Sequence, residues 1–445
     1  MSSIADSNFR DELRIPSFST LPTEIISEIF VSCLPFYLER RSTLNPNHAP
    51  MLLLCVCRKW RSIALSTPRL WALVNLDFDC LAQPFFEKRS WEKFLEDCVT
   101  RAGACPFSLR LKKGYKLEQD GWRFIPTILE QHSGRIQELE LMVDLGQYPK
   151  YTSGFPLLQK LKINLPAEYD DEDPEIIALK ENPIQIFAAA PQLRQLDLTY
   201  VTPSLFAIRW ENLAEFTAFG ISSSDCVDVL RWAPSLVRCT ISSPYLEPDT
   251  TAVSHPNLKS FTFSEMFTTE RIFRFLTFPT LEYLNLFMKD MDDAHFLQFV
   301  SRSSSSLLRL TSRFAAVPLE SLSNMVALTR LTLYAPSREY LVEFFDHFDR
   351  TKNPAFLPQL KMLAFKDCLL FVNQLLIDAL SSRCSVTQDG GVILQSFCQV
   401  WSENRVVDTL YDLFDLEGYV PAVFDKLVDA GMDIYVGPAV RSSYL

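Results

Sequence analysis

The sequence predicts an α/β protein, with a short helical module at the N-terminal end followed by a long array of strand–turn–helix units. Two observations predict this class. Apolar residues near the N-terminus recur at helical spacing between prolines, and after about residue 105 one short apolar pattern recurs about ten times. The chain has 445 residues, of which 48% are apolar and 22% charged, a composition typical of a folded protein.

The first predicted element is a helix that begins at Leu21 and Pro22. Proline suits the first helical position because its missing N–H would be unpaired there in any case, and Glu24 lies in the first turn, where the helix dipole favours an acid. Pro35 is expected to end the helix. Residues 1–17 are polar and charged and are expected to form a flexible tail. The apolar residues of this helix lie on one face and are Ile25, Ile26, Ile29, Phe30 and Cys33.

A loop rich in proline and asparagine, over about residues 36–50, separates this helix from a second predicted helical stretch. The second stretch begins near Met51 and continues through Val56 to Ala64. A segment from Thr67 to Trp71 closes the module.

Three submotifs of this module, taken in order, resemble the F-box. They are Leu21-Pro22-x-Glu24-Ile25-x-x-x-Ile29-Phe30, Val56-Cys57-Arg58-Lys59-Trp60-Arg61-x-Ile63-Ala64 and Thr67-Pro68-x-Leu70-Trp71. The resemblance covers about residues 20–71 and is especially similar to the F-box proteins found in large numbers in mushroom-forming fungi. It implies an F-box module over residues 18–75 that docks on the adaptor subunit of an SCF-type (cullin-RING) ubiquitin ligase.

The resemblance also implies which residues contact the adaptor. They are Leu21, Pro22, Ile25, Ile26 and Ile29 in the first submotif, and Cys57, Arg58, Lys59 and Trp60 in the second. A module of about 50 residues cannot bury every apolar side chain internally, and a Leu or Ile buried against a partner contributes roughly 1.5–3 kcal/mol. The alternative is that these residues only form the module's own core. We favour the interface for Leu21 and Pro22, and the core for Phe30, Val56 and Ile63.

Beyond this module the pattern Leu-x-x-Leu-x-Leu recurs, often with a proline two positions before it. Its last two apolar positions have period two and predict a short strand with one buried face. Phe107, Leu109 and Leu111 predict the first, capping strand of the array. The later predicted strands contain Leu139, Leu141, Leu161, Ile163, Leu196, Leu198, Phe216, Ala218, Cys239, Ile241, Phe261, Phe263, Leu284, Leu286, Leu310, Leu331, Leu333, Leu363 and Phe365.

The repeats begin 20–35 residues apart, and most spacings fall within the range of leucine-rich repeats. Helical stretches lie between strands, for example at 225–232 and 296–300. One strand, one turn and one helix per repeat predict a leucine-rich-repeat-like α/β solenoid over residues 76–445. The asparagine usual in the family's longer motif is absent, so the repeats are degenerate. A helix over 421–430, a stop at Gly431 and a last strand predict the C-terminal cap.

Two wider spacings contain insertions. The first is acidic, from Glu168 to Glu175, and a solvated loop is favoured over a site for a basic substrate. The second contains Tyr340, Phe344, Phe345 and Phe348 at helical spacing, and a helix packed in the core is favoured over an exposed aromatic site.

The sequence contains no pattern typical of an enzyme. The five histidines are isolated, and Cys-x-x-Cys, Gly-x-Ser-x-Gly and glycine-rich phosphate-binding motifs are absent. The net charge of −11 argues against a nucleic-acid partner. The repeats show no concentrated arginine cluster in sequence, which argues mildly against recognition of a phosphorylated target. We therefore expect a non-catalytic protein with no cofactor and no metal.

The resemblance and the repeats together imply a substrate-recognition subunit of an SCF-type ubiquitin ligase. The F-box would bind the adaptor, and through it the cullin, while the solenoid would bind an unidentified protein target. The alternative is an F-box/solenoid scaffold or binding protein that acts outside a complete ubiquitin ligase. The 11 scattered cysteines and the lack of an apolar N-terminal run predict a cytoplasmic and/or nuclear protein. We expect it to be monomeric on its own and to bind no membrane.

Overall fold

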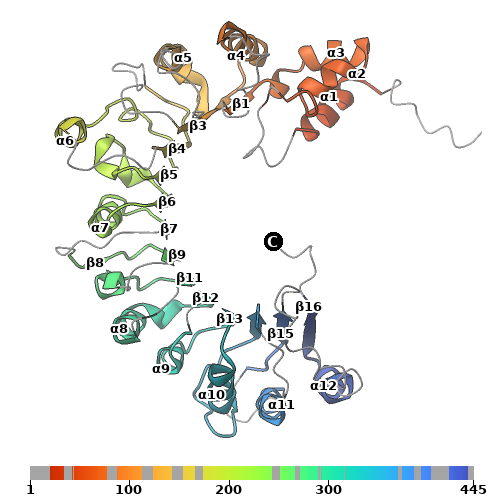
Figure 1. Cartoon of the computed structure of the whole chain (residues 1–445), viewed down its shortest axis with the longest axis vertical. Coiled ribbons are helices and arrows are strands. Elements are labelled where there is room, and N and C mark those ends of the chain that lie inside the picture. Colours follow the sequence, from red (N-terminus) through yellow and green to blue (C-terminus); the bar gives the residue numbers. More distant parts are fainter. Residues whose placement is uncertain are drawn as a thin grey trace, which may run out of the picture. The chain divides into compact units, whose positions relative to one another are not determined.

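The fold is that of a computed structural model of the chain (Figure 1). The acidic insertion from Glu168 to Asp173 and the expected tail over residues 1–17 lie outside the residues that the structure describes. Those residues are 21–34, 43, 45–77, 88–112, 124–142, 154–165, 174–242, 251–265, 271–288, 291, 293–314, 316–368, 373–384, 392–401 and 420–438.

Fourteen of the described strands form one open parallel sheet, in which the strands follow one another in chain order. Two further short strands, β8 (Val253–Ser254) and β10 (Leu276–Thr277), pair with each other. Because parallel neighbours need a crossover connection, each chain segment between strands returns along the sheet before the next strand begins. The predicted α/β class is confirmed. The described residues form two compact units.

The first unit contains the described residues up to Leu193 together with Phe206–Ile208. Its core is formed by the buried side of the sheet and by the inner sides of the helices, for example Leu109, Leu139 and Leu161. Its strands are β1 (Leu73–Asp77), β2 (Phe107–Lys112), β3 (Ile136–Met142) and β4 (Lys160–Asn164). Its helices are α1 (Thr23–Ser32), α2 (Met51–Val56), α3 (Arg58–Leu65), α4 (Lys88–Ala102), α5 (Phe124–His132) and α6 (Pro174–Glu181).

The predicted second helical stretch is two helices, α2 and α3, because the chain is extended at Cys57 (φ −160°, ψ 170°). The Cys57 Sγ accepts a hydrogen bond from the backbone N–H of Trp60 at 3.5 Å, which caps the start of α3. The Arg61 side chain donates from Nε to the Leu54 carbonyl at 2.8 Å and joins the two helices. The break therefore has a defined geometry.

The prediction that Phe107–Lys112 is the first strand is wrong, because β1 precedes it and pairs with it in parallel. Val74 and Leu76 of β1 are buried. The free side of β1 is extended by Thr43, whose backbone N–H donates to the Asn75 carbonyl at 2.8 Å. The Asn75 N–H in turn donates to the Thr43 hydroxyl at 2.8 Å. The strands thus begin at the point where the helical module was expected to close.

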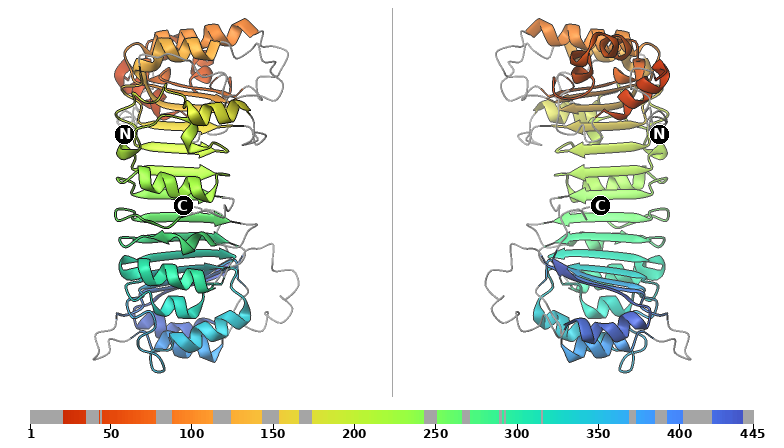
Figure 2. Two further views of the ribbon diagram at one scale, coloured as in Figure 1. Left: turned by 90° about the vertical axis from the view of Figure 1, so that its left-hand side faces the viewer. Right: turned by 90° about the vertical axis from the view of Figure 1, so that its right-hand side faces the viewer.

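The second unit contains the described residues of 194–205 and those from Arg209 onward. Figure 2 shows its strands stacked in chain order, and Figure 1 shows its helices on one face of the sheet. Its remaining strands are β5 (Gln195–Thr199), β6 (Glu215–Phe219), β7 (Arg238–Ser242), β9 (Ser260–Glu265), β11 (Tyr283–Met288), β12 (Arg309–Phe314), β13 (Arg330–Tyr334), β14 (Met362–Lys366), β15 (Ser396–Trp401) and β16 (Asp433–Pro438). Its helices are α7 (Ser223–Trp232), α8 (Asp293–Ser303), α9 (Leu319–Ser323), α10 (Arg338–Phe348), α11 (Gln374–Ser381) and α12 (Val420–Asp429).

Every strand predicted from the repeated pattern is present. Within each, the two apolar positions are buried and alternate with more exposed ones, as in β5, β7 and β13. The aromatic insertion forms α10, and Phe344, Phe345 and Phe348 are buried, which confirms the core interpretation. The predicted C-terminal helix and last strand are α12 and β16.

The prediction of one helix per repeat is wrong for some connections. Between β5 and β6 the described helical turns are the 3-10 helices Pro203–Leu205 and Trp210–Asn212, and between β9 and β11 they are Arg271–Arg274.

A left-handed residue recurs two positions after the second core residue of a strand. It is found at Tyr200, Gly220, Phe314, Ala335 and Asp367, with φ between 52° and 74°. The same backbone turn therefore ends five of these strands. Glycine adopts this conformation freely, whereas a side chain such as that of Phe314 does so at a cost of about 1 kcal/mol or more.

Candidate functional site

Helix α1 presents one apolar side to the module's core and a second apolar side to solvent. Ile26 and Phe30 are buried. On the other side Pro22 is exposed, and Ile25 and Ile29 are exposed by 49% and 37%. Positions 22, 25 and 29 are separated by three and four residues, so these side chains form one strip along the helix. We call Pro22, Ile25 and Ile29 the α1 strip.

Helix α1 is fixed to the closing segment of the module by polar contacts. The Glu28 carboxylate forms an ion pair with the Arg69 guanidinium at 2.5 Å. The Thr67 hydroxyl donates to the Ile63 carbonyl at 2.7 Å and lies 3.0 Å from the Ser27 hydroxyl. The exposed ion pair contributes little by itself, but together these contacts fix the orientation of the α1 strip.

The aromatic residue of the closing segment is part of the core. Trp71 is buried, and its indole N–H donates to the Ala64 carbonyl at 2.8 Å. The Arg101 guanidinium lies 4.7 Å from the Trp71 ring centroid, a cation–π contact that joins α4 to the module. The third submotif is thus a structural support for the other two.

The residues predicted from the second submotif surround the break at Cys57. Cys57, Arg58 and Lys59 are exposed, while Trp60 is half-buried and its ring lies 4.9 Å from that of Phe30. The Phe30–Trp60 contact brings the first and second submotifs together. Leu21 is half-buried, whereas Ile26, predicted as an adaptor contact, is fully buried in the module's core and is not on the exposed side of α1.

Sequence reasoning missed part of the exposed apolar surface of this module. Leu52 and Val56 of α2 are exposed by 44% and 51%, and Leu65 at the end of α3 by 38%. The assignment of Val56 to the core is wrong, whereas Phe30 and Ile63 are buried as expected. The separation of Leu52 and Val56 by four residues was a signal for a shared helical side, but the break at Cys57 that turns this side outward had no sequence signal.

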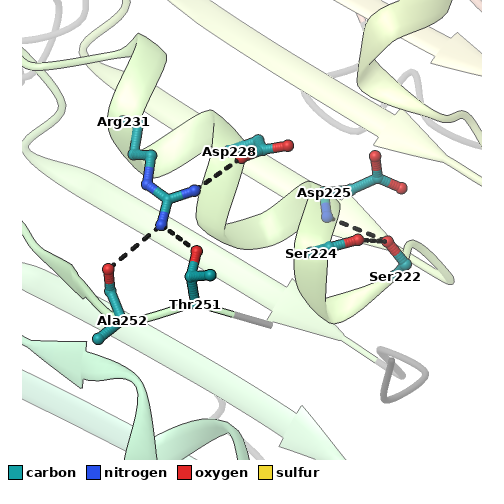
Figure 3. Close-up of polar contacts among 7 residues, drawn as sticks. All are labelled: Ser222, Ser224, Asp225, Asp228, Arg231, Thr251 and Ala252. Carbon is teal, nitrogen blue, oxygen red and sulfur yellow. Dashed lines mark hydrogen bonds and ion pairs between the residues drawn. The ribbon is translucent and has the colours of Figure 1, made fainter. Parts of the chain in front are cut away.

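The polar cluster around α7 has a structural role (Figure 3). The Ser222 hydroxyl accepts from the Asp225 backbone N–H at 3.0 Å and caps the helix. Arg231 pairs with Asp228 at 3.0 Å and donates to the Thr251 hydroxyl and to the Ala252 carbonyl. These contacts hold the chain that leads into β8 against the helix.

Burial raises the pKa of several thiols in the described part of the chain. Burial raises the pKa of Cys98 and of Cys239 to about 12, so both stay protonated and weakly nucleophilic near neutral pH. Within the described residues no group of three or more His, Cys, Asp and Glu side chains is arranged to hold a metal ion. None of the described helices is long and apolar enough to cross a bilayer.

No protein-family model matches the chain, and no curated protein is similar enough in sequence to be matched.

Proposed function

We propose that this protein is the substrate-recognition subunit of an SCF-type ubiquitin ligase. In this proposal α1, α2 and α3 form an F-box module that binds the adaptor, and the strands and helices that follow form a leucine-rich-repeat-like solenoid that binds the target protein. The chain itself carries no chemistry. It raises the effective concentration of a target near the ubiquitin-carrying enzyme.

The α1 strip is the observation that carries the proposal. Ile25 and Ile29, exposed by 49% and 37%, lie with Pro22 along one exposed side of a helix whose other side already fills a core. They coincide with residues that the F-box resemblance assigns to the adaptor. The Thr67 hydroxyl contacts Ser27 of α1 and the Ile63 carbonyl of α3, and these contacts support the role of α1 as a rigid surface.

The solenoid part of the proposal is supported by the regular succession of parallel strands in chain order and by the left-handed turn that ends five of them. Repeats of this kind expose one long sheet face that can vary freely in sequence. Such a face suits recognition of a protein target without any catalytic pocket.

Adaptor affinity in the double variant Ile25→Ser/Ile29→Ser tests the proposal. Burial of a whole isoleucine contributes roughly 1.5–3 kcal/mol, and about half of each side chain remains to be buried, so both together contribute about 2 kcal/mol. The affinity for purified adaptor, measured by calorimetry, should fall roughly 30-fold. The matched control Val326→Ser/Val342→Ser removes two valines exposed by 53% and 44% outside the module and should bind as wild type does. Wild-type protein that binds no adaptor would contradict the proposal.

A further inference from the structure

The open face of strands β11 to β14 carries a group of cations that the sequence does not reveal. Figure 1 shows α8, α9, α10 and α11 on the other side of these strands. Strand alternation directs four basic side chains to the side without helices, and we call them the basic patch: Arg309 and Arg313 from β12, Arg330 from β13 and Lys366 from β14. The strand register brings them together. Arg309 lies opposite Arg330, and Tyr334 lies between Arg313 on one neighbouring strand and Lys366 on the other.

The cations of the basic patch have no acidic neighbour at the described outward positions of the strands around them, and Asp433 lies further along this face on β16. Among the described outward positions of β9 and β11 to β15, none is occupied by Asp or Glu. None of the four cations has an ion pair with a described residue, and the nearby Glu282 is paired with Lys259 at 2.8 Å. Asp367, which follows Lys366, lies beyond the end of β14 and is half-buried. Arg309 directly opposite Arg330 places like charges together, which destabilises a sheet unless an anion intervenes.

On other strands of the sheet several cations are paired with carboxylates. In the first unit Arg110 lies 3.9 Å from Glu138 and 3.7 Å from Glu140, and Lys162 lies 3.6 Å from Glu140. In the second unit Arg238 of β7 is paired with Glu215 of β6. The lack of carboxylates around the basic patch is therefore a local property and not a general feature of this chain.

Aromatic rings hold the cations in place without neutralising them. The Arg313 guanidinium lies 4.6 Å from the Phe287 ring centroid and 4.1 Å from that of Tyr334, and it donates to the Tyr334 hydroxyl at 3.2 Å. Its Nε is buried and has no hydrogen-bond partner in the described part of the chain. The Arg309 guanidinium lies 4.8 Å from the Tyr283 ring centroid. Ring contacts of this kind restrict arginine rotamers and reduce the entropy lost when an anion binds.

Apolar and neutral polar groups complete the surface. Phe314, at the end of β12, is exposed by 54% although its backbone is left-handed (φ 74°). An exposed aromatic side chain of this size offers apolar surface to a partner. Thr311 and Thr332 lie between the two rows of cations and offer hydroxyl groups to a bound backbone.

We propose that the basic patch is the docking site for an acidic, extended segment of a protein partner, with several Asp or Glu residues and apolar residues between them. Arg309 and Arg313 are four residues apart on one strand, which separates the two rows of cations by roughly 13 Å. One phosphate group cannot span that distance, whereas successive carboxylates of an extended segment can. A nucleic acid is disfavoured because the net charge of −11 repels a long polyanion, while a short acidic segment meets only the local field.

The identification of the acidic segment as part of the target protein rests on the proposed function. The binding itself can be measured without the adaptor. The test uses the full chain and a synthetic array of random 12-residue peptides. One subset of the array has a single phosphoserine and no Asp or Glu. Binding is compared for wild type, for Arg309→Gln/Arg330→Gln, and for the control Arg110→Gln/Arg238→Gln. The control also removes two positive charges, but from cations on other strands that are already paired with carboxylates.

We expect wild type to select peptides with at least three Asp or Glu residues and with affinity that falls in high salt. The affinity of the best peptide should fall roughly tenfold or more in Arg309→Gln/Arg330→Gln and less than about twofold in the control. Selection of neutral or basic peptides, selection of the phosphoserine subset, no selection at all, or equal losses in both variants would overturn the inference. The Ile25→Ser/Ile29→Ser variant should lose adaptor affinity but select the same peptides as wild type. Peptide binding therefore tests this inference independently of adaptor binding, which tests the proposed function.

Discussion

Replacing Arg383 with leucine should destabilise the second unit by about 3 kcal/mol. Arg383 is buried with 1% of its surface exposed, yet no described carboxylate pairs with it. Its guanidinium donates to three backbone carbonyls instead: Nε to Phe348 at 2.9 Å, Nη1 to Leu357 at 3.2 Å and Nη2 to Phe356 at 2.7 Å. It also lies 4.3 Å from the Phe348 ring centroid. One side chain thus fixes the end of α10 to the turn before β14.

The magnitude follows from two opposing contributions. Each carbonyl left without a donor costs about 1–3 kcal/mol, so three cost about 6 kcal/mol. Burial lowers the pKa of Arg383 to about 10 from 12.5, so burying the charged form costs about 3 kcal/mol. A leucine avoids this cost, so the net loss of unfolding free energy is about 6 minus 3, or about 3 kcal/mol. Arg383→Lys should not restore stability, because an ammonium cannot reproduce the planar set of three donors.

Thermal unfolding of the full chain provides the assay, and hydrogen exchange locates the effect. Arg383→Leu should lower Tm and speed amide exchange over residues 349–360, whereas Arg338→Leu, an exposed control on α10, should do neither. A free energy of unfolding within 1 kcal/mol of wild type, or full recovery in Arg383→Lys, would refute the reasoning.

Three further predictions concern the frame of the second unit. Gly220→Ala should destabilise by about 1–3 kcal/mol, because a Cβ there would lie 2.5 Å from the Tyr200 ring at φ +67°; Tyr200→Ala should recover part of this loss in a double-mutant unfolding cycle, and strict additivity would contradict the clash. Burial raises the pKa of Cys239 to about 12 from 9.0, so the thiol ionises in the unfolded state first, and the free energy of unfolding falls as pH rises from 9 to 12. Cys239→Ala should reduce the slope of unfolding free energy against pH, measured by urea titration, by up to ~1.4 kcal/mol per pH unit, and an unchanged slope would count against this. Ser337→Ala should lower stability by about 1 kcal/mol, because the Ser337 hydroxyl caps α10 by accepting from the Tyr340 N–H at 3.1 Å; an unchanged Tm would exclude that role.

The strands were predictable because their signal is local and repeated. A pair of apolar residues two positions apart, such as Leu331 and Leu333, predicts a strand with one buried face, and both are buried in β13. The helix α10 was predictable for a similar reason, because its aromatic residues recur at helical spacing.

The missed elements lack that signal. Strand β1 has only Val74 and Leu76 as its buried pair and no leucine three residues before them. Strand β15 has Phe397 buried, but Gln399 occupies its second buried position, so the apolar alternation is lost. The break at Cys57 depends on an extended backbone and a thiol cap, without a proline or glycine to mark it.

The basic patch could not be predicted from the sequence alone. Arg309, Arg330 and Lys366 belong to three different repeats, and only the strand register brings them to one surface. The sequence therefore showed no arginine cluster on the repeats, although the folded sheet contains one. Whether the α1 strip is exposed also depended on tertiary structure, because helical spacing alone assigns Ile25 and Ile26 to the same apolar face.

Assembly with adaptor and cullin tests the central claim most directly. The full chain would be co-expressed with the SCF adaptor, mixed with purified cullin and separated by size-exclusion chromatography, beside the variants Leu21→Ala/Pro22→Ala and Ile25→Ser/Ile29→Ser. The account predicts that wild type elutes with both partners in one complex and that both variants elute alone. Elution of wild type with the adaptor but without cullin would favour a scaffold that acts outside a complete ligase, and elution of wild type alone would contradict the account.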